Sequence, residues 1–223
     1  GCEGVLDIIY NPARTRFTLQ AEKLGIKNDT GLYMLIAQAK RSSELFTGGK
    51  IRDSIIDEIY RDLSLKMQNI ILIGMPGSGK STIASKLSKM TGREKADLDS
   101  LFKEVNGITP AECINTFGES KFRNMETKLA REYCKRSGLI ISTGGGIVTR
   151  PENYELLHQN GIIVWIKRDI EKLSVNGRPI SKRTGTQKLY EQRKSMYESF
   201  ADISVDNNRR VEDTALSILK MLK

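Results

Sequence analysis

A glycine-rich turn between an apolar run and a helical segment constrains the fold of this chain more than any other feature. Residues 69–73 read Asn-Ile-Ile-Leu-Ile, the length of a buried strand, and residues 80–90 have the pattern of a helix. Between them, residues 74–81 read Gly-Met-Pro-Gly-Ser-Gly-Lys-Ser, which matches the phosphate-binding pattern GxxxxGK[ST] in its required context. The alternative is an ordinary glycine turn. The match at all four fixed positions of the pattern, between a strand and a helix, argues against this alternative.

This loop predicts a nucleotide site, because its backbone N–H groups and the helix N-terminus attract phosphate. Lys80 should reach the β- and γ-phosphates, and Ser81 should bind Mg²⁺. The loop does not identify the phosphate acceptor, since GTPases, adenylate kinases and motor ATPases share it. The predicted ATP-binding residues here are Gly77, Ser78, Gly79, Lys80, Ser81 and Thr82.

The rest of the second part of the chain alternates apolar runs with helical patterns. Apolar runs occur at 139–141 and 162–166, and helical patterns lie near 109–136, 151–159 and 212–222. Continuous apolar strands between helices predict a parallel sheet covered on both faces. We therefore expect an α/β fold with a P-loop NTPase-type parallel sheet, similar to nucleoside monophosphate kinases, and a small, mostly helical N-terminal appendage.

The appendage begins with an apolar run at 5–10, which predicts a buried strand. Helices are expected at 15–24 and 31–46, followed by a connecting helix at 53–63. Residues 174–187 are polar and basic, and we expect them to form a mobile loop.

The positive charge is concentrated in the second part of the chain. The net charge is +9, and residues 67–223 carry +8 of it, with 26 Lys and Arg against 18 Asp and Glu. Such an excess predicts an anionic partner, and a nucleic acid is one candidate. The basic residues are dispersed, however, so a nucleoside triphosphate with an acidic substrate explains the excess equally well.

Cysteine usage favours a reducing compartment. The three cysteines, Cys2, Cys113 and Cys134, form no CxxC spacing, and His158 is the one histidine, so neither a disulfide framework nor a zinc site is expected. No apolar run has membrane-spanning length, and the first residues are not a signal peptide. We expect a cytoplasmic protein without membrane association, and a fragment or processed product because residue 1 is not Met.

Three clusters are candidates for the acceptor side. Asp97 and Asp99 are two residues apart on a segment expected to be extended, so they would point the same way, one toward Mg²⁺ and one toward a substrate hydroxyl. Arg123 and Glu126 share a helix face. Three glycines at 144–146 follow a strand, at the sheet edge where ligands bind in such folds. Each cluster has an alternative interpretation without a function. Asp97 and Asp99 could form a solvated acidic turn, Arg123 and Glu126 a surface salt bridge, and the glycines a flexible loop.

In order and spacing, these motifs resemble those of the shikimate kinase family over residues 68–222. The matching motifs are the loop at 74–81, the DxD at 97–99, GExxFRxxE at 118–126, TGGG at 143–146, Arg-Pro at 178–179, LYEQR at 189–193 and VDNNRR at 205–210.

The resemblance assigns roles on the acceptor side. It implies that Arg123 and Arg193 hold the shikimate carboxylate, for which the planar guanidinium fork is suited. It further implies that Asp99 orients the 3-hydroxyl and takes its proton, that Gly145 offers a backbone N–H, and that Glu126 braces the arginines.

On the nucleotide side, the resemblance implies that Asp97 lies near the Mg²⁺ shell and that Arg178 moves onto the γ-phosphate. Arg210 would flank the adenine. Lys80, Arg178 and Mg²⁺ would then neutralise the charge of the transferred group. One departure is that the family's arginine at the start of the lid falls here near Val175 and Asn176, in a shortened stretch.

Residues 1–50 resemble the carboxyl-terminal part of shikimate dehydrogenase. The matching segments are Asp7-Ile8-Ile9-Tyr10-Asn11-Pro12, Thr15, Leu19, Ala21, residues 31–39 and Thr47-Gly48. The resemblance implies that Tyr10 and Gln38 belong to a surface that once faced shikimate. The dinucleotide fingerprint and the catalytic Lys and Asp are absent, so we expect no dehydrogenase activity.

The expected organisation has three parts. Residues 1–50 are a dehydrogenase fragment, 51–66 a helical linker and 67–223 a shikimate kinase domain, as from a fused dehydrogenase–kinase. We expect a monomeric kinase domain that binds ATP and shikimate, with contacts through the N-terminal fragment. Two alternatives stay open, a kinase for another small acceptor, such as gluconate or a nucleoside monophosphate, and a nucleotide-dependent nucleic-acid-binding module.

Overall fold

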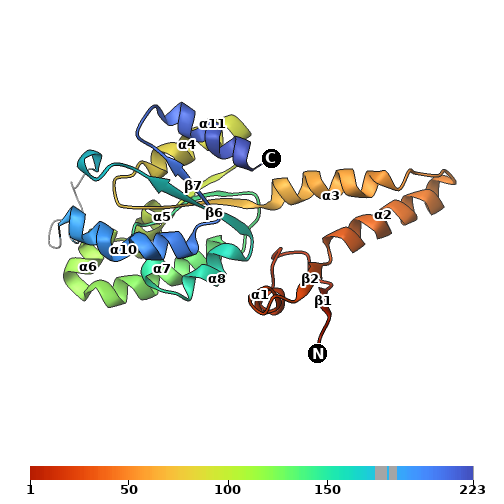
Figure 1. Ribbon diagram of the computed structural model, residues 1–223, viewed down its shortest axis with the longest axis horizontal. Helices are drawn as coiled ribbons and strands as arrows, with labels where there is room; N and C mark the ends of the chain where they lie inside the picture. The colour runs from red at the N-terminus through yellow and green to blue at the C-terminus, as the bar shows by residue number, and fades with distance from the viewer. Residues whose placement is uncertain (174–179, 181–184, 223) are drawn as a thin grey trace.

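The computed structural model describes residues 1–173, 180 and 185–222, coloured from red to blue along the chain in Figure 1. The loop predicted at 174–187 falls mostly outside these residues, and so does Arg178. Within the described part, no helix is both long enough and apolar enough to cross a membrane.

A five-stranded parallel sheet forms the centre of the larger unit, which confirms the predicted fold class. Its strand order is β4-β5-β3-β6-β7, so the strand before the phosphate loop lies in the middle. Ile71 of this central strand pairs with Ile141 on one side and Ile163 on the other. The strands are β3 (Asn69–Ile73), β4 (Lys95–Asp97), β5 (Ile140–Ser142), β6 (Gly161–Lys167) and β7 (Ile203–Asp206).

Helices cover both faces of this sheet (Figure 1). All five residues of β3 are buried, and they alternate between two cores, with Ile70 and Leu72 in one and Ile71 and Ile73 in the other. This two-sided burial is why the strand reads as continuously apolar. On the first core lie α4 (Lys80–Thr91) and α11 (Val211–Met221); on the second lie α5 (Leu98–Asn106), α6 (Pro110–Phe117), α7 (Glu119–Tyr133), α8 (Asn153–His158) and α10 (Thr186–Phe200).

Two local predictions need correction. The helical pattern near 109–136 is two helices, α6 and α7, which meet at Gly118. The first of them is fixed by a capping box, in which Thr109 and Glu112 satisfy each other's backbone N–H groups. The segment of Asp97 and Asp99 is not extended throughout, because helix α5 begins at Leu98, between the two acids.

The N-terminal part is a small αβ unit joined to the sheet by a helical hairpin. Helices α2 and α3 run side by side and extend away from the sheet in Figure 1. Tyr33 packs edge-on against Tyr60 across this hairpin, and Lys40 pairs with both Glu44 and Asp53. The elements are β1 (Gly4–Asp7), α1 (Arg16–Lys23), β2 (Lys27–Thr30), α2 (Leu32–Thr47) and α3 (Ser54–Met67).

The prediction of a buried strand at 5–10 is wrong. Strand β1 ends at Asp7 and pairs only with β2, in parallel. Helix α1 covers one face of this pair and buries Val5, whereas Leu6 and Ile8 are 84% and 76% exposed. The run is apolar on both faces, as in buried parallel strands, yet a two-stranded sheet with one covering helix buries only one face.

Asn160, buried just before β6, joins the N-terminal part to the larger unit. Its side-chain oxygen accepts from the backbone N–H of Ala13 at 2.6 Å. Its amide nitrogen donates to the Asn11 side chain at 3.1 Å and to the Lys135 carbonyl at 2.8 Å. Because one amide satisfies groups on both sides of the contact, the N-terminal part is anchored at the amino end of the sheet, opposite the phosphate loop.

The three cysteines provide a test of this fold. Cys2 is exposed, whereas Cys113 and Cys134 are buried free thiols. Burial raises the pKa of Cys113 and raises that of Cys134 to about 12. At pH 8 only about one Cys134 thiol in 10⁴ is then ionised, and the thiolate is the reactive form.

We therefore predict that the native chain exposes one fast-reacting thiol to an aromatic disulfide reagent at pH 8, and that unfolding in guanidinium chloride exposes three. The Cys2→Ser variant should lose the fast phase. Two or three fast thiols in the native chain would contradict the core described above.

Candidate functional site

A cavity of about 400 Å³ opens at the carboxyl edge of the sheet, beside the phosphate loop. Most of the predicted site residues meet there, although they come from five separate parts of the chain. The predicted residues that line the cavity are Gly77, Gly79, Lys80, Ser81, Thr82, Asp99, Arg123, Glu126, Gly145 and Arg193. The predictions for Ser78, Asp97 and Arg210 fall outside this lining, and Arg178 lies outside the described residues.

The phosphate loop places the N-terminus of α4 against the cavity. Gly79 is the cap residue of this helix, with φ +94°, and Lys80 is its first residue. The Lys80 ammonium group donates to the carbonyls of Gly74 and Met75 at 2.9 and 3.0 Å. The loop therefore brings a cation and the N–H groups of a helix N-terminus together, which is the arrangement that binds phosphate.

Asn207 braces this loop, a role that the sequence prediction did not assign. Its amide nitrogen donates to the Ser78 carbonyl at 2.7 Å, and its oxygen accepts from the Thr214 hydroxyl at 3.0 Å. The side chain is buried, and a Cβ at Gly79 would lie 2.5 Å from its nitrogen. Asn207 thus ties the loop to α11 and requires glycine at position 79. The structure places Asn207 just after strand β7, but the sequence shows only a polar residue there. It does not show the contact with Ser78, which lies 129 positions away.

Ser81 and Asp97 lie together, as predicted for a metal site. The Ser81 hydroxyl donates to Asp97 Oδ2 at 2.6 Å and lies 3.2 Å from the Ser142 hydroxyl. Hydroxyl and carboxylate oxygens are the ligands that Mg²⁺ prefers, with phosphates and waters completing its shell. Among the described residues there is no group of three or more His, Cys, Asp or Glu that could hold a metal without such help. The residues therefore fit Mg²⁺ that arrives with a nucleotide.

Asp97 and Asp99 have separate positions, contrary to the prediction that they point the same way. Asp97 caps α5, accepting from the Ser100 N–H at 3.1 Å, and faces Ser81. Asp99 lies in the first turn of that helix and lines the cavity, with Oδ1 3.1 Å from the position of a Cβ on Gly144. The helix start turns the second acid away from the metal side and toward the glycines.

Arg123 and Glu126 form a buried ion pair, which excludes the surface salt bridge considered above. Arg123 Nη1 lies 2.5 Å from Glu126 Oε2, and the two residues are 6% and 3% exposed. Burial raises the pKa of Glu126, against the opposing charge of Arg123. Burial also acts to lower the pKa of Arg123, but Glu126 and Glu119 together raise it. The guanidinium therefore stays charged in a buried position and is fixed in orientation by two carboxylates.

The glycines at 144–146 allow the acceptor arginines to approach the backbone. A Cβ on Gly146 would collide with the Arg123 guanidinium, and the Gly145 carbonyl accepts from Arg193 Nη1 at 3.1 Å. The buried Tyr197 hydroxyl donates to the same carbonyl at 2.5 Å, and burial raises the pKa of Tyr197 to about 12. Tyr197 is a second residue that the sequence prediction missed; it helps to hold Gly145 in place.

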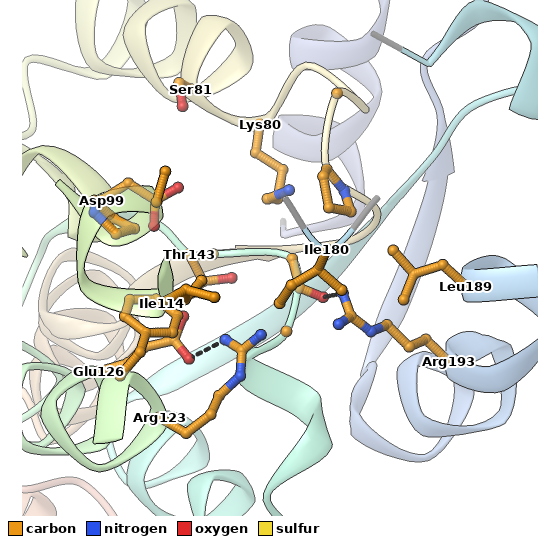
Figure 2. A pocket seen from close by; sticks show the side chains of 18 of the residues that line it. Lys80, Ser81, Asp99, Ile114, Arg123, Glu126, Thr143, Ile180, Leu189 and Arg193 are labelled. Carbon is orange, nitrogen blue, oxygen red and sulfur yellow. Dashed lines mark hydrogen bonds and ion pairs between the residues drawn. The ribbon is translucent and has the colours of Figure 1, made fainter. Parts of the chain in front are cut away.

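Figure 2 shows how these groups face one another. Arg123 from α7 and Arg193 from α10 enter from different helices and direct their guanidinium groups into the cavity, with Lys80 and Asp99 on its other sides. Two buried guanidinium groups beside a phosphate loop suit a small molecule that carries a carboxylate.

Arg210 lies away from the cavity, whereas several residues without a predicted role line it. Arg210 precedes α11, and its side chain is 79% exposed and paired with Asp213 at 3.1 Å. The remaining lining residues, to which the sequence prediction assigned no individual role, are mostly apolar or glycine and include one further arginine, Arg168. These residues are Pro76, Pro110, Ala111, Ile114, Phe122, Thr143, Gly144, Gly146, Arg168, Ile180 and Leu189.

Comparisons with known proteins point to one family. The family model described as "Shikimate kinase" matches residues 76–223. The shikimate kinase of Enterococcus faecalis is 34% identical over 168 residues, which are 70% of this chain and 99% of the relative. The shikimate kinase of Clostridium beijerinckii is 34% identical over 159 residues, which are 69% of this chain and 94% of the relative.

Solved structures of shikimate kinases are also similar to this chain. The shikimate kinase of Acinetobacter baumannii, determined in complex with shikimate, is similar with a TM-score of 0.67 and 30% identity, over 73% of this chain and 96% of that one. The shikimate kinase of Aquifex aeolicus is similar with a TM-score of 0.61 and 29% identity, over 70% of this chain and 96% of that one.

The loop brace gives a testable prediction. Asn207→Ala removes the donor to the Ser78 carbonyl and the acceptor for Thr214, so two buried polar groups lose their partners. We predict that the Kd for Mg-ADP, measured by calorimetric titration, rises about 10-fold, the equivalent of about 1.4 kcal/mol.

The neighbouring Asn208→Ala variant is the control, because its amide contacts Asp169 instead of the loop. An Asn207→Ala protein that melts at a lower temperature but binds Mg-ADP as tightly as the wild type would show that Asn207 supports only the fold.

Proposed function

The chain belongs to the shikimate kinase family, and on that premise we propose that it transfers the γ-phosphoryl group of ATP to the 3-hydroxyl of shikimate. The products are 3-phosphoshikimate and ADP, a step toward chorismate and the aromatic amino acids. The observation that carries the choice of acceptor is the pair of buried arginines, Arg123 and Arg193, in the same cavity as the phosphate loop.

On the nucleotide side, the backbone of Gly77, Ser78 and Gly79 and the start of α4 bind the phosphates of ATP. Lys80 turns from the carbonyls that it now contacts to the β- and γ-phosphates. Ser81 and Asp97 hold the Mg²⁺ that accompanies the nucleotide. When bound, this ion neutralises charge that develops on the transferring group. Thr82 completes this wall of the cavity.

On the acceptor side, Arg123 and Arg193 bind the carboxylate of shikimate. Each is already oriented, Arg123 by Glu126 and Glu119 and Arg193 by the Gly145 carbonyl, so little ordering remains for the substrate to induce. The Gly145 N–H provides a further contact. Asp99, on the other wall, accepts a hydrogen bond from the 3-hydroxyl, directs its oxygen toward the γ-phosphate and takes its proton.

The mechanism is therefore one of alignment and charge neutralisation. Phosphoryl transfer needs the attacking hydroxyl and the γ-phosphate in line, with cations on the transferring oxygens. The two halves of the cavity supply the alignment, and Lys80 supplies a cation. From the resemblance alone we add Arg178 as a second cation on the γ-phosphate and Arg210 beside the adenine. We also propose a cytoplasmic location, which the three free thiols support.

For the N-terminal part, we propose that residues 1–50 are a carboxyl-terminal piece of a shikimate dehydrogenase domain, joined through 51–66 to the kinase domain at 67–223. The exposed apolar side chains of Leu6, Ile8 and Phe46 support this, because they are typical of a surface that the rest of a domain would cover. The piece should be inactive; oxidation of NADPH that depends on dehydroshikimate would contradict this.

The kinase proposal predicts shikimate-dependent release of ADP from Mg-ATP. Arg123→Ala should lower kcat/KM for shikimate by about 100-fold or more, because it removes two charge-assisted hydrogen bonds to the carboxylate. Lys121→Ala, an exposed site on the same helix, should leave kcat/KM unchanged.

Because Arg123→Ala also leaves Glu126 without its partner, Arg193→Lys is measured in parallel. This variant keeps the charge but loses the planar fork, so it should raise KM for shikimate more than it changes kcat. If the wild type binds ATP but shikimate releases no ADP, the acceptor assignment fails while the nucleotide site stands.

A further inference from the structure

One guanidinium group in the cavity makes no hydrogen bond or ion pair with the part of the chain that the structure describes. Arg168 is the first residue after β6, at the carboxyl edge of the sheet, and it lines the cavity. Its Nε is buried and has no hydrogen-bond partner. A buried donor on a charged group without a partner costs free energy, and such exceptions in a well-packed region call for an explanation.

The position of Arg168 suggests what it binds. Its Nη1 lies 3.6 Å from the position that a Cβ on Gly79 would occupy. Gly79 caps α4, so the guanidinium group lies beside the N-terminus of the helix that faces the phosphates. The backbone N–H groups of such a loop hold the α- and β-phosphates, whereas its lysine reaches the β- and γ-phosphates.

The neighbouring charges leave Arg168 available. The next residue, Asp169, is the nearest acid in the sequence, but its carboxylate already contacts Lys172 and the Asn208 amide, each at 2.9 Å. The preceding residue, Lys167, lies over the Trp165 ring, 4.6 Å from its centre. Arg168 thus differs from Arg123, whose charge is already paired with carboxylates.

We propose that Arg168 is a nucleotide-binding residue that donates hydrogen bonds to the α- or β-phosphate, the part that ATP and ADP share. It acts from the β6 side of the loop as a second cation beside Lys80. This role is additional to the residues assigned above and rests on the proposed nucleotide site. Its guanidinium offers several donors in one plane, which suits phosphate oxygens.

The experiment compares Arg168→Ala and Arg168→Lys with the wild type by calorimetric titration with Mg-ADP and by NMR titration with adenosine. We expect Arg168→Ala to raise the Kd for Mg-ADP about 10-fold or more, the size of a charge-assisted hydrogen bond, and Arg168→Lys to recover part of the loss. Adenosine binding should stay unchanged, because adenosine has no phosphate. Arg131→Ala, an exposed arginine on α7, is the matched control.

Two further readouts separate binding from folding. The melting temperature of the ligand-free protein should not fall in Arg168→Ala, because Arg168 has no hydrogen bond or ion pair with the described residues to lose, whereas the rise in melting temperature on adding Mg-ADP should shrink. In turnover, KM for ATP should rise about 10-fold while KM for shikimate stays constant.

An Arg168→Ala protein that binds Mg-ADP like the wild type would overturn the inference, and so would equal losses for adenosine and ADP, which would indicate contact with the base. These results can be told apart from a failure of the proposed function. A wild-type protein that binds Mg-ADP but phosphorylates no shikimate would refute the acceptor assignment, and the Mg-ADP affinities of the Arg168 variants would still test the inference.

Discussion

The carboxyl ends of five parallel strands meet at one edge of the sheet, and the proposed chemistry depends on this constraint. Each strand delivers a group to that edge. Strand β3 leads into the phosphate loop and β4 ends at Asp97, while β5 leads into the glycines at 144–146. Strand β6 is followed by Arg168 and β7 by Asn207. Because adjacent parallel strands run in register, residues far apart in the sequence reach one cavity without long loops. The N-terminal part attaches at the opposite edge, through Asn160, where it leaves the cavity open.

The charge states of the side chains at this edge depend on their burial and pairing as much as on the number of cations. Arg123 is kept charged in the interior by Glu126 and Glu119, and Glu126 in turn depends on Arg123, because burial alone favours its protonated form. Breaking such a pair leaves an uncompensated charge, so the pair fixes one orientation of the guanidinium. Lys80 donates to two carbonyl oxygens of the phosphate loop, and Arg168 makes no hydrogen bond or ion pair with the described residues. Arg123, paired with carboxylates, suits the recognition of a substrate carboxylate, whereas Arg168 suits phosphates that arrive with the nucleotide.

The sequence predicted those parts of the fold and site that depend on local pattern. The apolar run at 69–73, the glycine loop and the helix after it are found as predicted, because a strand buried on both faces and a phosphate loop each have a strict local signature. The short strand β7 was missed, since four residues carry little periodicity. Asp97 and Asp99 were predicted to point the same way, but a helix cap separates them. Asn207, Tyr197 and Arg168 could not be recognised, because their roles arise only when distant strand and helix ends come together. The run at 5–10 was predicted buried because it is apolar, yet only one of its faces is covered.

The central claim is that one cavity at the sheet edge aligns shikimate with the phosphates of a nucleotide, and a crystal structure of the chain with Mg-ADP and shikimate tests it most directly. We predict that the carboxylate of shikimate contacts Arg123 and Arg193. Its 3-hydroxyl should lie between Asp99 and the position that the γ-phosphate of ATP would occupy, and the ADP phosphates should lie over Gly79 and Lys80. Shikimate bound with its carboxylate away from both arginines, or at a site separate from the phosphate loop, would contradict the account.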